Sequence, residues 1–104
     1  MIRLIKSQAW VMLLVYLVIA AGPAIASDPE KGRSYYNMQC VACHGKNGAG
    51  ITPDMPNFHR GDGLWTSDTQ LVKRIEAGKN GCPPYLGILN RQKIFDLISY
   101  LRTF

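Results

Sequence analysis

The pattern of apolar and polar positions predicts three helices after residue 27. The clearest is the last, where Ile94, Leu97, Ile98 and Leu101 follow one another at intervals of three and four residues. This spacing places the apolar side chains along one face of an amphipathic helix. Asn90 precedes it and is a favourable N-cap, so we expect a helix from there nearly to the C-terminus.

The first of the three helices is marked by its start signal. Residues 28–30 (Asp-Pro-Glu) combine an oxygen-bearing cap, a proline in the first turn and an acid at the positive end of the helix. We expect this helix to run towards Cys40. Gly32 and Tyr36 lie on one of its faces, and the glycine allows another helix to approach closely.

The second helix is short. Ser67 and Gln70 form a capping-box pattern ahead of an apolar group at residues 71–75, and Gly78 supplies the stop. The connecting segments 45–66 and 78–89 are rich in Gly, Pro, Asn and Asp and show no sustained alternation, so strands are not expected. Loops this long in a small domain normally wrap something, and a large apolar cofactor would account for them.

The N-terminus has the order of a secretory signal peptide. Arg3 and Lys6 precede an apolar run from residue 10 to residue 21, and residues 22–26 (Gly-Pro-Ala-Ile-Ala) resemble a cleavage site. We therefore expect residues 1–26 to be a leader and residues 27–104 to be the folded domain. The alternative is an uncleaved membrane anchor, because residues 7–27 carry no charge.

Composition limits the function of this domain. Only 78 residues follow residue 26, with ten basic and seven acidic side chains among them. A domain below roughly 80 residues usually needs a disulfide, metal or cofactor for stability, and it is too small for a multidomain enzyme. The mild positive charge contains no basic run that would indicate a nucleic acid partner.

Residues 40–44 (Cys-Val-Ala-Cys-His) form the C-x-x-C-H motif of covalent c-type haem attachment. Two thiols at this spacing reach the two porphyrin vinyl groups and leave the adjoining imidazole beneath the iron. We expect thioethers at Cys40 and Cys43 and an iron ligand at His44. The alternatives are a thioredoxin-like redox pair, a zinc half-site and a plain disulfide, but the sequence lacks the strand context of the first and the second ligand pair of the zinc site.

With these features the chain resembles the class I cytochromes c over essentially all of residues 27–104. The matching positions are Gly32 and Tyr36, residues 40–44, the turn 78–81 with residues 83–85 (Pro-Pro-Tyr), and the last helix with Tyr100. The resemblance implies an all-α cytochrome c fold, with three main helices and long loops around one covalent haem c. It also implies that Pro83, Pro84 and Tyr85 shape the distal loop beside the haem.

The chain departs from this family at Cys82, where relatives place the distal methionine. After two thioethers one thiol is left over, and an exported protein seldom leaves a reactive thiol unused. We therefore expect Cys82 to be the second metal ligand, opposite His44. There are two alternatives. Either Met55 or His59 reaches across the haem and binds the iron, or Cys82 is a buried apolar side chain above a five-coordinate or water-bound iron.

Other residues carry weaker expectations. Trp65 or Tyr85 is a candidate hydrogen-bond donor to a haem propionate, with ordinary core packing as the alternative. Lys79 is a candidate replacement ligand for Cys82 at high pH. The resemblance more simply suggests that it is a docking charge for an acidic partner, together with other lysines around the haem edge: Lys46, Lys73 and Lys93.

These features favour an exported, periplasmic electron carrier with one haem and transient redox protein partners. Membrane association is expected only if the leader is uncleaved. A thiolate at Cys82 would favour ferric iron and lower the reduction potential relative to methionine ligation. The alternatives are a haem-based redox or gas sensor in which Cys82 leaves the iron on reduction, and a small haem subunit of a sulfur-oxidising or dehydrogenase complex.

Overall fold

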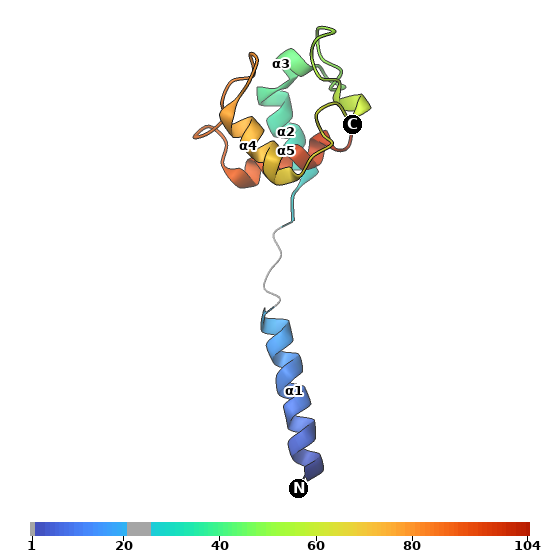
Figure 1. Cartoon of the computed structure of the whole chain (residues 1–104), viewed down its shortest axis with the longest axis vertical. Coiled ribbons are helices and arrows are strands. Elements are labelled where there is room, and N and C mark those ends of the chain that lie inside the picture. Colours follow the sequence, from blue (N-terminus) through green and yellow to red (C-terminus); the bar gives the residue numbers. More distant parts are fainter. Residues whose placement is uncertain (1, 21–25) are drawn as a thin grey trace.

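The computed structural model describes residues 2–20 and 26–104. Its elements, in chain order, are α1 (Ile2–Ala20), α2 (Pro29–Gln39), α3 (Val41–His44), the 3-10 helix η1 (Phe58–Arg60), α4 (Asp68–Ala77) and α5 (Arg91–Leu101) (Figure 1). Over these described ranges the β-type pairing is a single isolated bridge between Lys79 and Cys82. The predicted all-α class is therefore confirmed.

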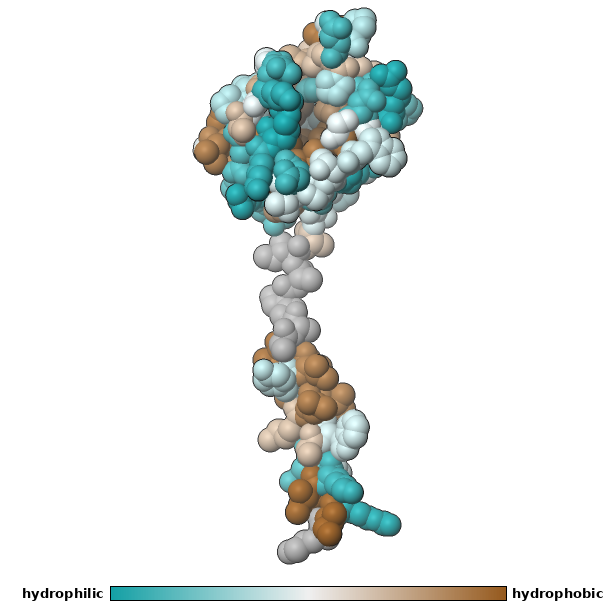
Figure 2. Space-filling model, viewed as in Figure 1, coloured by the Kyte–Doolittle hydropathy of each residue, from teal (hydrophilic) through white to brown (hydrophobic). Residues whose placement is uncertain are grey.

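Helix α1 is exposed and mostly apolar. None of its window Ile2–Ile19 is buried against the rest of the chain, and the mean hydropathy of that window is 1.7. Figure 2 shows its apolar side chains uncovered. Length and composition suit either a membrane-spanning helix or a signal sequence. Most of the expected cleavage region, residues 22–25, lies outside the described residues.

The three main helices begin where the sequence predicts. Asp28, Ser67 and Asn90 are their N-caps, and each side-chain oxygen accepts backbone N–H groups of the first turn. Gly78 ends α4 with a φ of 69°, a conformation that favours glycine. The short helices α3 and η1 were not predicted, because a single turn is too short to show a hydrophobic period.

Helices α2 and α5 cross in close contact (Figure 1), and Gly32 lies against the backbone of α5. A Cβ atom built on Gly32 would lie only 1.9 Å from the main-chain oxygen of Asp96. Beside this contact the ring of Tyr36 is completely buried, and it meets the rings of Tyr100 and Phe104 edge to face at 5.4 and 5.3 Å. The prediction that glycine permits a close helix approach is confirmed. The rest of the core comes mainly from α4, α5 and the loops beside them: Leu64, Leu71, Val72, Tyr85, Leu89, Ile94, Leu97, Ile98 and Leu101.

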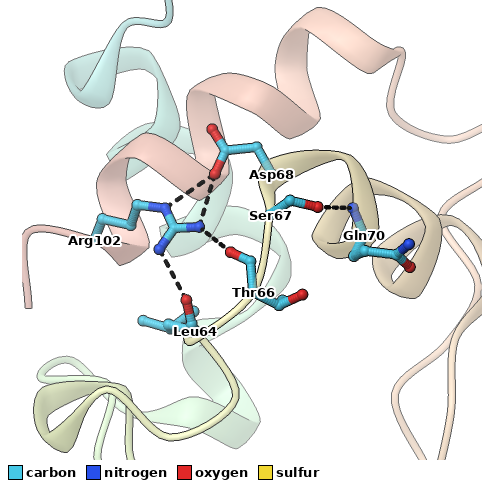
Figure 3. A network of polar contacts seen from close by, with 6 residues as sticks. All are labelled: Leu64, Thr66, Ser67, Asp68, Gln70 and Arg102. Carbon is cyan, nitrogen blue, oxygen red and sulfur yellow. Dashed lines mark hydrogen bonds and ion pairs between the residues drawn. The ribbon is translucent and has the colours of Figure 1, made fainter.

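Arg102 ties the end of α5 to the segment that leads into α4 (Figure 3). Its guanidinium donates to the Asp68 carboxylate at 2.7 and 3.0 Å and to the backbone carbonyls of Leu64 and Thr66, both at 2.9 Å. Arginine suits this role because its planar group presents several donors in fixed directions. One side chain thus fixes the end of the predicted loop 45–66 and the first residue of α4.

We expect Arg102→Ala to lower the free energy of unfolding by about 1–2 kcal/mol, because two backbone carbonyls and a carboxylate lose their charged donor. In a domain of this size the midpoint of thermal unfolding should fall by several degrees. The matched control is Arg33→Ala, whose ion pair with Glu30 is exposed and within one helix turn, and which should cost much less. Equal losses in both variants would show that the Arg102 network has no special role.

Candidate haem-binding site

Helices α2 and α3 bring the three motif side chains onto one turn. Cys40 closes α2 and caps α3, so that its carbonyl accepts the N–H of Cys43 at 3.2 Å and the N–H of His44 at 2.9 Å. None of the three cysteines pairs with another in a disulfide. Two thiols and an imidazole therefore leave the same turn of backbone, as attachment of a single porphyrin requires.

The environment of His44 fits that of a metal ligand. Its ring stacks on the ring of Phe58, with centroids 4.7 Å apart. Within the described part of the chain, its buried Nδ1 atom has no hydrogen-bond partner, which is unusual for a buried polar group. Burial, helped by the nearby Arg74 charge, lowers the pKa of His44. A neutral imidazole is the form that binds metals.

The loop that follows His44 folds back onto the same side of the site. Gly50 donates its N–H to the His44 carbonyl at 2.8 Å. Met55 is half-buried in this loop, and its Cβ lies 2.8 Å from a Cβ built on Gly50. His59 is exposed in η1, next to the Phe58 that stacks on His44. The two alternative second ligands thus belong to the loop that packs around the His44 ring.

Cys82 is held by a tight two-residue turn. Lys79 and Cys82 exchange two backbone hydrogen bonds of 3.0 Å, and between them Asn80 and Gly81 have φ angles of 51° and 87°. Asn-Gly with both φ angles positive is the preferred hairpin turn of this length. A Cβ on Gly78 would lie 2.6 Å from the Cys82 carbonyl oxygen, so a glycine is needed for this segment to pack against the end of α4.

Tyr85 fixes the same segment from its other end. Its buried hydroxyl donates to the carbonyl of Gln39 at 3.0 Å, and its N–H donates to the carbonyl of Ile75 at 3.1 Å. The distal segment 78–85 is therefore tied both to α4 and to the residue before Cys40. The sequence placed Tyr85 in this segment but did not indicate either bond.

The three thiols lie close enough together to influence one another. Burial and, to a smaller extent, the neighbouring Cys82 and Cys43 sulfurs together raise the pKa of Cys40 to about 12. Burial also raises the pKa of Tyr85, with added contributions from the same three cysteines. Cys82 and Tyr85 thus lie near the Cys-x-x-Cys turn in the fold, although more than 35 residues of chain separate them from it.

The remaining expected site residues lie at the surface. Pro83 is exposed next to Cys82, and the Trp65 side chain is 89% exposed, with its indole against Gly61. Trp65 therefore does not belong to the polypeptide core, and its assignment to a propionate stays a prediction.

Nothing in the sequence pointed to Arg74, because its approach to His44 depends on how α4 packs and no motif marks it. The four lysines differ in setting: Lys46, Lys73 and Lys79 are exposed, whereas the Lys93 ammonium lies 5.6 Å above the ring of Tyr35.

The chain is similar to known cytochromes over most of its length. Residues 27–101 match the family described as cytochrome c oxidase, cbb3-type, subunit III. A cytochrome c6 of Thermosynechococcus vestitus is 24% identical over 97 residues, which cover 86% of this chain and 82% of the relative. A cytochrome c-553-like protein of Synechocystis is 26% identical over 85 residues, covering 77% of this chain and 72% of the relative.

The matched region includes the whole Cys-x-x-Cys-His turn, the distal segment and the crossing of α2 with α5. The protein is thus a small c-type cytochrome with one covalently bound haem c, and an electron carrier rather than an enzyme. By the extent of this match, the chain belongs to the cbb3-type cytochrome c oxidase subunit III family of cytochrome c domains.

Proposed function

We propose that this cytochrome is an exported, low-potential carrier of single electrons whose iron is held by His44 and by the thiolate of Cys82. Cys40 and Cys43 attach the porphyrin through thioethers. The bound haem supplies an iron that alternates between the ferric and ferrous states. The chain would supply the two iron-binding groups and the exposed surface that a redox partner contacts.

The observation that carries the proposal is the fixed position of Cys82. The Asn80-Gly81 turn and the Tyr85 hydroxyl hold the distal segment against α4 and against the residue that precedes Cys40. Cys40 and Cys82 are both partly buried against the same core cluster, which supports a location of Cys82 near the attachment turn. Met55 and His59, in contrast, lie in the loop bonded to His44.

A thiolate ligand has a predictable effect on the redox equilibrium. The negative sulfur stabilises the more positively charged ferric iron more than the ferrous iron, whereas a neutral methionine thioether raises the potential. The partner that reduces this protein must therefore be a stronger reductant than one that serves a methionine-ligated relative. The exposed lysines 46, 73 and 79 favour a partner with an acidic docking surface.

Export follows from the leader. Helix α1 is apolar, unburied and at the N-terminus, and cleavage after Ala26 would release a domain that starts just before the α2 cap. Haem attachment outside the cytoplasm also explains how three cysteines can be present in an oxidising compartment without a disulfide, since two would become thioethers and one would bind iron.

Electron paramagnetic resonance of the ferric holoprotein tests the ligand assignment. We expect a low-spin spectrum typical of thiolate and imidazole ligation, and conversion of Cys82→Ala to a high-spin or water-bound form. Met55→Leu and His59→Asn are the matched controls and should leave the spectrum unchanged. An unaltered low-spin spectrum in Cys82→Ala, with a change in either control, would assign the second ligand to the loop after His44.

A further inference from the structure

Asp96 is the one charged side chain among the buried residues described. It is only 3% exposed, in the middle of α5 where α2 crosses. Its Oδ1 atom accepts the backbone N–H of Asp28 at 2.8 Å and the side-chain amide of Gln92 at 3.0 Å. Nothing in the electron-transfer role uses this carboxylate, which is far along the chain from the attachment motif.

The donors to Asp96 are both neutral. Among residues 2–20 and 26–104, no lysine or arginine forms an ion pair with it. A buried carboxylate is costly unless a positive charge or several hydrogen bonds offset its loss of hydration. A cation close to Oδ1 would offset this cost further, and the chain immediately before Asp28 runs close to Oδ1 because the Asp28 N–H is bonded to it.

We propose that removal of residues 1–26 creates a positively charged α-amino group at Ser27 that pairs with the buried Asp96 carboxylate and so stabilises the crossing of α2 and α5. This inference rests on the proposed cleavage after Ala26. The Asp28 nitrogen is 2.8 Å from Oδ1, and consecutive backbone nitrogens are at most about 3.6 Å apart, so the Ser27 nitrogen lies within about 6.5 Å of Oδ1. Ser27 is exposed, which leaves its new terminus free to turn towards the carboxylate.

Some of the other charges near this terminus attract the Ser27 amine and others repel it. The Asp28 carboxylate also attracts the amine, although it accepts the backbone N–H groups of Glu30 and Lys31 as the α2 cap. The positive end of α2 opposes the amine. Four other charged groups lie on the first turns of α2 and α5: Glu30, Lys31, Arg91 and Lys93. Glu30 pairs with Arg33 and Arg91 pairs with Glu76, whereas Lys93 lies over the ring of Tyr35.

In the uncleaved chain, Ser27 contributes a neutral amide and this pairing cannot form. Cleavage therefore stabilises the folded domain in addition to releasing it. Because pairing raises the pKa of the amine in the folded state, the added stability is present below the ordinary α-amino pKa, about 7.7–8.0. It is lost as the pH rises through the raised native value.

Four holoproteins test the pairing. Two of them begin at Ser27, and two carry an added Ala-Gly dipeptide before Ser27, which moves the amine away from the site. In each pair, one protein keeps Asp96 and the other carries Asp96→Asn. The α-amino pKa is measured by NMR after isotopic methylation of the amine. The equilibrium constant of unfolding is measured with denaturant at pH 6 and pH 10.

We expect a raised amine pKa only in the chain that begins at Ser27 and keeps Asp96. The dipeptide should increase the unfolding constant at pH 6 about tenfold in the Asp96 chain, which corresponds to a native pKa raised by about one unit. It should change that constant less than twofold in the Asp96→Asn chain. If Asp96→Asn does not fold, the Asp96 chain alone still tests the proposal, because the dipeptide should no longer change its unfolding constant at pH 10.

An ordinary amine pKa in the Ser27 chain, or a dipeptide effect that persists in Asp96→Asn, would overturn the pairing. The cleavage site is tested separately by mass spectrometry of protein produced with its native leader. An N-terminus other than Ser27 would overturn the proposed cleavage, and with it the link to processing, whichever value the amine pKa takes in the engineered Ser27 chain.

Discussion

Replacing Cys82 with methionine should raise the reduction potential of the holoprotein by on the order of 100–300 mV. The substitution exchanges an anionic sulfur for a neutral thioether at the position where class I relatives place methionine. The backbone that presents residue 82 is fixed by the Asn80-Gly81 turn and by Tyr85, so the longer side chain starts from the same place. Every ~60 mV corresponds to a tenfold change in a one-electron equilibrium.

The potential is measured by spectroelectrochemical titration of the wild-type protein and of Cys82→Met under the same buffer conditions. Met55→Leu is the matched control, because Met55 is the other sulfur-bearing candidate and lies in the loop after His44. We expect this control to shift the potential by less than about 60 mV. An unchanged potential in Cys82→Met would mean that residue 82 does not bind the iron in at least one oxidation state.

The helices could be predicted because their signals are local. Asp28, Ser67 and Asn90 each cap a helix through an oxygen only two or three residues from its partner, and such signals survive in the sequence whatever the tertiary fold. The attachment motif is visible for the same reason, since its three side chains lie within five residues. Gly32 was recognised from its spacing to Tyr36, and the structure confirms the close contact with α5.

The interactions that sequence analysis missed join residues far apart in the chain. Arg102 reaches Leu64 and Asp68, Asp96 accepts from Asp28, and Tyr85 donates to Gln39. Each depends on how helices pack, and a donor or acceptor with a distant partner leaves no periodic pattern. Trp65 shows the converse: an aromatic residue suggests burial, yet in this fold its side chain lies almost wholly outside the polypeptide core.

Gly32→Ala should destabilise the folded holoprotein by about 3 kcal/mol or more, a large part of the stability of a small domain. Helix propensity alone predicts the opposite, a gain of about 1 kcal/mol. Sterics decide the sign, because the new Cβ would lie 1.9 Å from the Asp96 carbonyl oxygen and 2.5 Å from its carbon. Both are backbone atoms of α5, so relief requires the two helices to separate.

Separation of α2 from α5 would loosen the buried rings and side chains at the crossing, and it would lengthen the 2.8 Å bond from Asp28 to Asp96. The loss is measured by guanidinium denaturation of the ferric holoprotein, followed by circular dichroism. Ser34→Ala is the matched control, since Ser34 lies on an exposed face of α2, and it should change stability by less than about 0.5 kcal/mol. A Gly32→Ala variant as stable as wild type would mean that the two helices can part without cost. The tight crossing would then not be what holds the attachment turn at the end of α2 in place.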